Sequence, residues 1–187
     1  MCLPRCETKM KLDFGIQSSA FFSDSNDMAA LLQRFRKPGG FSQLLALIET
    51  CDPLKQKNLL HLIGNEDPGW AYLVKLKMLT CDRVLTWPVE TLMEITTHLP
   101  DRVLAAAWSI AAPLPQGSQL QEKWLKSLPT MKSREIKSVI DSTSFSPSEL
   151  QAAGIRIVQT VRELEEKDLL RFSQFDPALE IDQRVAA

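Results

Sequence analysis

The sequence predicts an all-α fold, a stack or bundle of short amphipathic helices, on three grounds. Three capping side chains stand directly before prolines, at Asp52-Pro53, Asp67-Pro68 and Ser146-Pro147. Such a side-chain oxygen accepts a hydrogen bond from an N–H at the helix start, and a first-turn proline has no N–H to leave unpaired. Apolar residues then recur every three or four positions, which is helical spacing. No stretch of convincing length alternates as a strand would.

These signals also place the helices along the chain. We predict helices at about residues 26–36, 41–51, 53–64, 68–79, 88–98, 100–111, 117–128, 131–142 and 147–171. Ser146 to Glu149 form a capping box at the start of the last helix, and Pro88 and Pro100 are expected in first turns. The connections are short, so consecutive helices should pack antiparallel as neighbours.

The chain is expected to divide into four parts. Residues 1–37 form a poorly ordered N-terminal segment with a possible helix, 38–80 a first helical unit, 81–172 a second helical unit and 173–187 a polar tail. Gly39 and Gly40 interrupt the helical pattern and are predicted to be a linker. They lack the wider glycine pattern of a phosphate-binding loop, so we assign them no nucleotide.

Composition and charge exclude several classes of protein. Lys and Arg number 22 against 23 Asp and Glu, so the formal net charge is −1, whereas a protein that neutralises many phosphates is usually basic. We therefore expect no nucleic-acid partner. No apolar run approaches the ~20 residues that span a bilayer, and the N-terminus lacks the apolar core of a signal peptide. A cytoplasmic protein without direct membrane insertion is expected.

No set of residues predicts catalysis, a cofactor or a metal. The sequence contains no G-x-S-x-G, phosphate-loop or H-E-x-x-H motif. Cys2 and Cys6 have a spacing that could form half of a metal site, but neither His61 nor His98 pairs with a cysteine at ligand spacing. The two histidines fall late in predicted helices, where a histidine complements the helix dipole.

The large aromatic and charged side chains are expected to have structural roles. None of the four tryptophans lies in a basic cluster suited to base stacking; we expect most in the core and one or two on a partner surface. They are Trp70, Trp87, Trp108 and Trp124. The charged residues 162–167 share one predicted helix and are expected to form a solvated face with pairs at i,i+4.

Several motifs occur in an order that is typical of one known family. They are Arg36-Lys37-Pro38-Gly39-Gly40-Phe41, Leu44 to Glu49 followed by Asp52, Glu66-Asp67-Pro68, Met78-Leu79-Thr80-Cys81-Asp82, and Ser146 to Glu149 with Arg162 to Glu166. By these motifs, residues 36–172 resemble the C-terminal part of the bacterial flagellar motor switch protein FliG. The resemblance implies an armadillo-like helical unit, a hinge, and a small C-terminal helical bundle.

The same resemblance implies a function. It implies a rotor component in motility and chemotaxis that binds a FliM-like switch protein, and that can also meet a MotA-like stator or neighbouring FliG-like subunits. Such a protein is peripheral at the cytoplasmic face of the inner membrane, in the flagellar basal body. The resemblance implies no enzymatic activity and no cofactor.

Candidate site residues also come from the resemblance. Met78, Leu79 and Cys81 fall where the family has its Met-Phe-x-Phe hinge, with Leu79 and Cys81 in place of the phenylalanines. The family's charged torque helix falls on residues 131–142, which carry the predicted partner-binding residues Lys132, Arg134, Glu135, Lys137 and Asp141. The family's Asp-Asp pair falls on Ser138-Val139 and its lysine on Trp108, so the resemblance does not extend to full torque generation.

Three functions remain open at this point. The first is a non-catalytic FliG-like component of the flagellar motor switch. The second is a helical-repeat adaptor or paralogue that kept the fold and lost the motor role, for example in a related secretion apparatus. The third is a small enzyme that uses Cys81 or His98, for which no base or orienting group stands at a suitable spacing.

Overall fold

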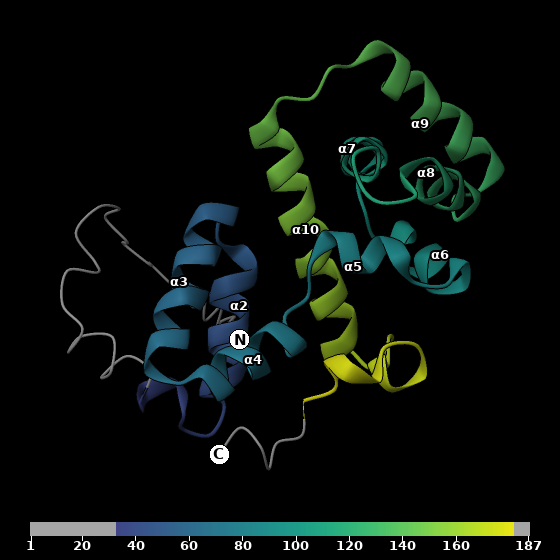
Figure 1. Ribbon diagram of the computed structural model, residues 1–187. Helices are drawn as coiled ribbons and strands as arrows, with labels where there is room; N and C mark the ends of the chain where they lie inside the picture. Colours follow the sequence, from purple (N-terminus) through teal and green to yellow (C-terminus); the bar gives the residue numbers. More distant parts are fainter. Residues whose placement is uncertain (1–32, 182–187) are drawn as a thin grey trace, which may run out of the picture.

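The computed structural model describes residues 33–181, and over this range the chain is built from helices and their connections, with no strand (Figure 1). The predicted all-α fold is confirmed. The armadillo-like form of the first unit and the predicted domain boundaries stay predictions. Of the helix predicted at 26–36, residues 33–36 fall within the described range; 33–35 are helical and Arg36 lies in the turn that follows. Cys2 and Cys6 lie outside it.

The first unit consists of three helices around one small core. They are α2 (Gly40–Thr50), α3 (Pro53–Glu66) and α4 (Pro68–Lys77). The two predicted caps are present: the Asp52 and Asp67 side chains each accept a hydrogen bond at 3.0 Å, from the Lys55 and Trp70 amides. Buried apolar residues of all three helices form the core, together with Phe35: Phe41, Leu44, Leu45, Ile48, Leu59, Ile63, Ala71 and Val74.

The second unit has its own, larger core. Its helices are α5 (Cys81–Thr86), α6 (Val89–Thr97), α7 (Asp101–Ala111), α8 (Gly117–Lys126), α9 (Thr130–Ser142) and α10 (Pro147–Glu166). Helix α7 packs against α8, α9 and α10. The indole of Trp124 is fully buried here and donates to the Leu104 carbonyl at 2.9 Å. The capping box at Ser146 and Glu149 is present as predicted.

One helix was not predicted, and several helix boundaries differ from the predictions. Helix α5 was not predicted, because six residues carry too little periodicity; its start is marked by Thr80, whose hydroxyl accepts from the Arg83 amide at 3.3 Å. Pro88 and Pro100 stand one residue before their helices rather than in first turns. Helix α10 ends at Glu166 rather than at 171, because Asp168 adopts a left-handed conformation with φ of 57°, which a helix cannot continue.

Residues 173–181, predicted to belong to a polar tail, are folded against the second unit. After α10 the chain forms two short 3₁₀ turns, η1 (Phe172–Gln174) and η2 (Pro177–Leu179). Phe172 and Leu179 are buried in the core of the second unit. Their burial was not predicted, because the residues around them are mostly polar.

The predicted linker at Gly39 and Gly40 is a tight turn between Phe35 and the start of α2. Gly39 has a φ of 77°, in the left-handed region that favours glycine. A Cβ at Gly40 would lie 2.6 Å from the Phe35 carbonyl oxygen, which is too close for any side chain. Both glycines are therefore explained by local geometry.

Candidate functional site

The charged helix α9 lies at the end of the molecule farthest from α2–α4 (Figure 1). Its inward side is fixed by Ile136, which is fully buried, and by Val139 and Ile140, which pack against the core of the second unit. Lys132 also turns inward, toward α7, where its ammonium lies 3.4 Å from the Asp101 carboxylate. Packing therefore holds α9 in one orientation.

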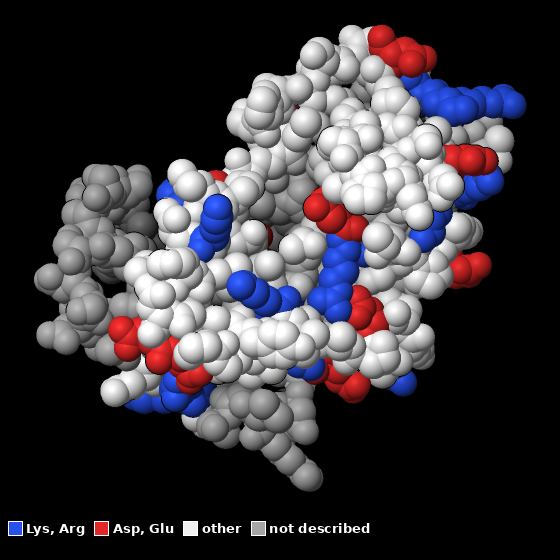
Figure 2. All heavy atoms as spheres, viewed as in Figure 1, with Lys and Arg blue, Asp and Glu red and all other residues white. Residues whose placement is uncertain are grey.

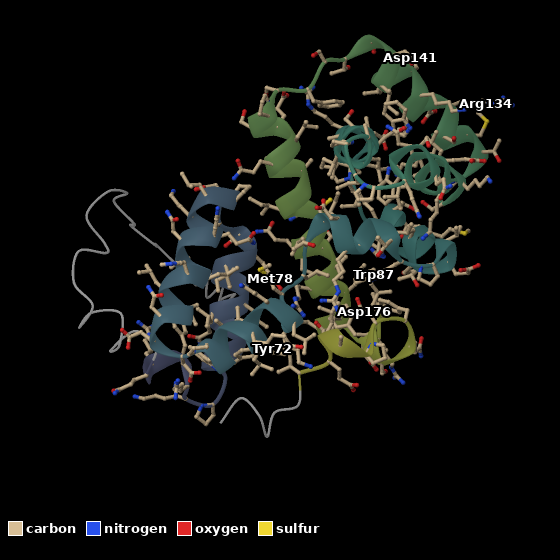
Figure 3. All side chains as sticks on the ribbon, in the orientation of Figure 1. Tyr72, Met78, Trp87, Arg134, Asp141 and Asp176 are labelled. Carbon is tan, nitrogen blue, oxygen red and sulfur yellow. The ribbon has the colours of Figure 1, made fainter. Side chains whose placement is uncertain are left out.

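The other four predicted partner-binding residues are exposed. Within residues 33–181, no ion pair or side-chain hydrogen bond involves Arg134, Glu135, Lys137 or Asp141. Side chains of both signs lie on this end of the molecule (Figure 2), and Arg134 and Asp141 lie apart along α9, with Asp141 near its end (Figure 3). This outward face of α9 can offer both attraction and repulsion to a charged surface.

The positions where the resemblance places missing charges have different environments. Ser138 is exposed on α9, but Val139 is half-buried. Trp108 is half-buried on α7, and its carbonyl accepts from the Gln121 amide at 3.1 Å. Of the four tryptophans, Trp87 and Trp124 are buried whereas Trp70 and Trp108 are half-buried.

The predicted hinge residues lie where the chain crosses from one core to the other. Met78 packs against the core of the first unit, and Leu79, 1% exposed, belongs to the core of the second. The backbone of Met78 and Thr80 is extended. Cys81 begins α5 and packs against the second core. Residues 78–80, here called the hinge segment, are the covalent connection between α4 and α5.

A buried ion pair ties the two units together beside the hinge segment. The guanidinium of Arg162, on α10, donates to both carboxylate oxygens of Glu49, on α2, at 2.7 and 3.1 Å. The side chains are only 18% and 2% exposed. Burial alone would lower the pKa of Arg162, but hydrogen bonds and charge from Glu49 and Glu165 raise it above its ordinary value.

A second ion pair lies within the second unit, next to the hinge segment. Arg83, on α5, donates to both oxygens of Asp176 at 2.6 and 2.7 Å, and the Trp87 indole donates to the same carboxylate at 3.1 Å. Trp87 and Asp176 point toward each other in Figure 3. Burial opposes ionisation of Asp176, but the hydrogen bonds from Arg83 and Trp87 outweigh it, so the pKa lies below its ordinary value.

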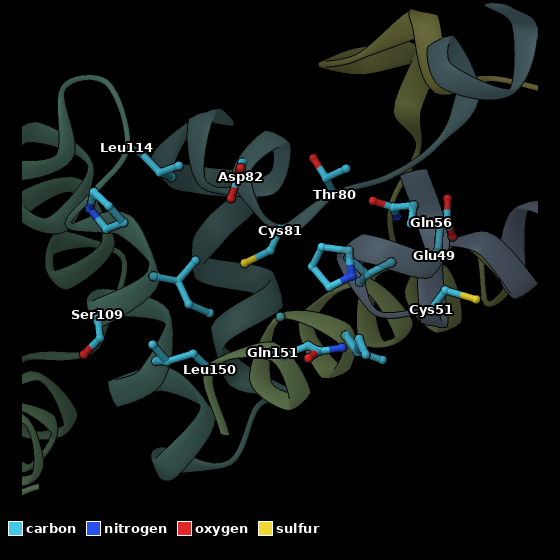
Figure 4. A pocket seen from close by; sticks show the side chains of 16 residues that line it. Glu49, Cys51, Gln56, Thr80, Cys81, Asp82, Ser109, Leu114, Leu150 and Gln151 are labelled. Carbon is cyan, nitrogen blue, oxygen red and sulfur yellow. The ribbon is translucent and has the colours of Figure 1, made fainter. Parts of the chain in front are cut away.

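An open groove of about 440 Å³ lies between the two units. Its walls come from the α2–α3 turn, the start of α5, the end of α7 and the outer side of α10. Cys51 and Cys81 both line it, with their sulfur atoms pointing away from each other (Figure 4). Burial raises the pKa of the Cys81 thiol to about 12, and the charge of Asp82 adds to the shift. A thiol with this pKa is a poor nucleophile at neutral pH.

Sequence reasoning missed the residues that position the two units. Arg162 was expected on a solvated face, but it is largely buried against Glu49. Sequence patterns could not show this, because Glu49 lies 113 positions earlier in the chain. Asp176 was expected in a polar tail. The one nearby residue that indicates pairing of Arg162 is Glu165, three positions later. Its carboxylate accepts a hydrogen bond from the Arg162 guanidinium at 3.1 Å.

Residues 33–181 contain no group of three His, Cys, Asp or Glu side chains that could hold a metal ion. Over the same range, no helix has the length and apolar character needed to cross a membrane. The arrangement is that of a helical module in two halves, which a buried ion pair joins, with further charged side chains exposed on α9.

Comparison with known proteins identifies the family of this module. The family model of the FliG C-terminal domain matches residues 61–172, from the middle of α3 to the first residue of η1, which is more than half of the chain. The chain therefore belongs to the FliG C-terminal domain family, a family of flagellar motor switch components. The resemblance noted in the sequence is confirmed. A search of curated proteins found no match.

Proposed function

We propose that this protein is a non-catalytic interaction component of the flagellar motor switch, which acts at the cytoplasmic face of the basal body. The observation that carries the proposal is the outward face of α9, with Arg134, Glu135, Lys137 and Asp141 exposed and held on a packed helix. Membership in the FliG C-terminal domain family supports a partner among the proteins of the flagellar motor.

Exposed charges suit this role because they act collectively. A single exposed ion pair contributes about 0–1 kcal/mol, so one residue of α9 cannot hold a partner. A set of charges in fixed positions instead sets the orientation and rate of docking. Ile136 fixes the position of the set, since it is fully buried beneath it. Lys132 contributes less, because it already pairs with Asp101.

The proposed partners are a FliM-like switch protein and, through α9, a MotA-like stator or a neighbouring FliG-like subunit. The test measures binding of the purified chain to a FliM-type protein and to the cytoplasmic part of a MotA-type stator by calorimetry. The doubly reversed variant Arg134→Glu, Lys137→Glu should lose at least about tenfold in affinity for the partner that α9 meets.

A matched control reverses two lysines of the first unit. Lys57 and Lys75 are exposed on α3 and α4, so Lys57→Glu, Lys75→Glu changes the net charge by the same amount at a distance from α9. This variant should bind within about twofold of the unmodified chain. The proposal fails if neither partner binds, and its α9 part fails if both variants lose affinity equally.

One observation favours a second function, that of a helical adaptor or paralogue without a motor role. The positions of the family's Asp-Asp pair and of its lysine hold Ser138, Val139 and Trp108, and two of these three are packed rather than exposed. The adaptor function gains support if reversal of Lys132, Arg134 and Lys137 leaves swimming motility unchanged in cells while partner binding persists.

A further inference from the structure

The backbone around the hinge segment is held by ionised side chains from three different elements. Arg83 donates to the Leu76 carbonyl at 2.8 Å and reaches that of Met78 at 3.4 Å. Arg162 donates to the Lys77 carbonyl at 3.1 Å, and Glu49 accepts from the Leu79 amide at 2.7 Å. Charge-assisted hydrogen bonds are stronger than neutral ones, so these three side chains hold the backbone of residues 76–79 in place.

Residues 172–181, here called the strap, connect these contacts to both units. Phe172 and Leu179 are buried in the core of the second unit. Between them, Asp176 binds Arg83 through both carboxylate oxygens. At the far end the strap reaches the first unit, where the Glu180 carbonyl accepts from the Lys77 ammonium and Ile181 packs against the first core.

The two units have separate cores, and this determines what the strap can do. The Phe41–Leu45–Ile48 core and the Leu104–Trp124–Ile136 core form two distinct clusters. Rotation about the hinge segment therefore does not require either core to come apart. Opening would also return Glu49 and Arg162 to water together, which avoids the penalty of one buried charge without its partner. The contacts that cross between the units are the Glu49–Arg162 pair, the bonds from Arg83 to the carbonyls of residues 76 and 78, and the end of the strap. Asp176 acts on them indirectly, because it holds Arg83 in place within the second unit.

We propose that the strap is a conformational lock, which holds the two units in the closed arrangement and releases the hinge when the Asp176–Arg83 pair or the Lys77–Glu180 contact is lost. The lock fixes the direction in which α9 points relative to α2–α4. Its release leaves both units folded and lets them change their relative orientation. This inference rests on the contacts of residues 49–181 and does not depend on which partner α9 binds.

The test is amide hydrogen exchange in the full chain, measured by mass spectrometry on peptides that cover residues 76–81. Asp176→Asn removes the charge that holds Arg83 and should speed exchange there by at least about fivefold. Peptides from α2 and α7 report on the two cores and should keep their protection. Small-angle X-ray scattering of the same variant should show a larger radius of gyration.

Asp168→Asn is the matched control. Asp168 forms a similar two-oxygen pair with Arg171, at 2.8 and 2.9 Å, but both residues are exposed and neither touches the hinge segment. This variant should exchange like the unmodified chain. Equal acceleration by Asp168→Asn and Asp176→Asn would overturn the proposal, and so would unchanged exchange in Asp176→Asn.

A second pair of variants tests the conformational lock if Asp176→Asn does not fold. Lys77→Met removes the bond to the Glu180 carbonyl without touching either core, and should speed exchange at residues 76–81 by about twofold or more. Lys75→Met alters an exposed lysine two residues away that has no such bond among the described residues. If Lys77→Met and Lys75→Met exchange at the same rate, the strap does not lock the hinge.

Discussion

The junction between the two units and the outward face of α9 are both rich in charge, but their charges have different environments. At the junction, Glu49 and Arg162 are largely buried, and each makes hydrogen bonds to its partner and to the hinge backbone. On α9, Arg134 and Lys137 are exposed and form no ion pair within residues 33–181. Buried charges must be paired where they lie, whereas exposed charges remain available to a partner.

This difference means that loss of a charge should have different consequences in the two places. Removing a charge at the junction should destabilise the fold and change the arrangement of the two units. Removing one on α9 should leave the fold intact and change only what the surface meets.

The largest effect is expected from Arg162→Met. The substitution leaves the Glu49 carboxylate buried without its partner, so the free energy of unfolding should fall by about 3–5 kcal/mol. Urea denaturation of the purified chain, followed by circular dichroism, measures the change. A double variant that also converts Glu49 to Leu should recover part of the loss, because no unpaired charge then remains.

Arg156→Met is the control for this variant. Arg156 lies on the same helix, is about half exposed and pairs with Glu163 only at 3.8 Å. Its loss should cost less than about 1 kcal/mol. Equal costs for Arg156→Met and Arg162→Met would show that burial at the junction does not decide the effect.

A smaller effect is expected when Leu79 is replaced by phenylalanine, the residue type that the family resemblance places there. Leu79 is 1% exposed and belongs to the core of the second unit. The larger ring should therefore destabilise the chain by about 1–3 kcal/mol. In the control, Leu54→Phe, the side chain is 69% exposed and the change should be within about 0.5 kcal/mol. A neutral Leu79→Phe would show that the hinge still has room for the family's aromatic residue.

The contrast between the two regions also shows which structural features can be predicted from the sequence. The caps at Asp52, Asp67 and Ser146 were predictable because each bond joins residues three positions apart. The exposed face of α9 was also predictable from local sequence, because helical spacing places Ile136 on a different side of the helix from Arg134 and Lys137. Local geometry determines all of these features.

The junction could not be predicted in this way. Arg162 looks like its exposed neighbours in sequence, and only the folded chain brings Glu49 to it from 113 positions away. Asp176 is 93 positions from Arg83, in a stretch that its polar composition predicted to be a tail. Positions that depend on such distant partners have no periodicity or cap to identify them.

A pH dependence is expected from Asp176. Its pKa is lowered in the folded chain, so its contribution to stability is present above the unfolded pKa of about 3.9 and is lost as the pH falls through the lower folded value. Asp176→Asn should therefore cost about 1–2 kcal/mol at neutral pH, and the difference should shrink as the pH drops below about 4. Urea denaturation across this pH range measures it.

Glu180→Gln provides the comparison within the strap. The Glu180 side chain is exposed, and the Lys77 contact uses its backbone carbonyl, which the substitution keeps. This variant should therefore stay close to the unmodified chain at every pH. A constant difference between Asp176→Asn and the unmodified chain down to acidic pH would mean that the charge of Asp176 does not stabilise the fold.

The smallest effect on stability is expected on α9. Arg134→Glu and Lys137→Glu should each change the free energy of unfolding by no more than about 0.5 kcal/mol, because both side chains are exposed and unpaired in the described residues. Lys132→Glu should cost up to about 1 kcal/mol, since it converts the attraction to Asp101 into repulsion. Thermal unfolding of the three variants ranks them. If Arg134→Glu or Lys137→Glu destabilised the chain more than Lys132→Glu, the outward charges of α9 would be structural, and a lost interaction with a partner could no longer be attributed to its surface.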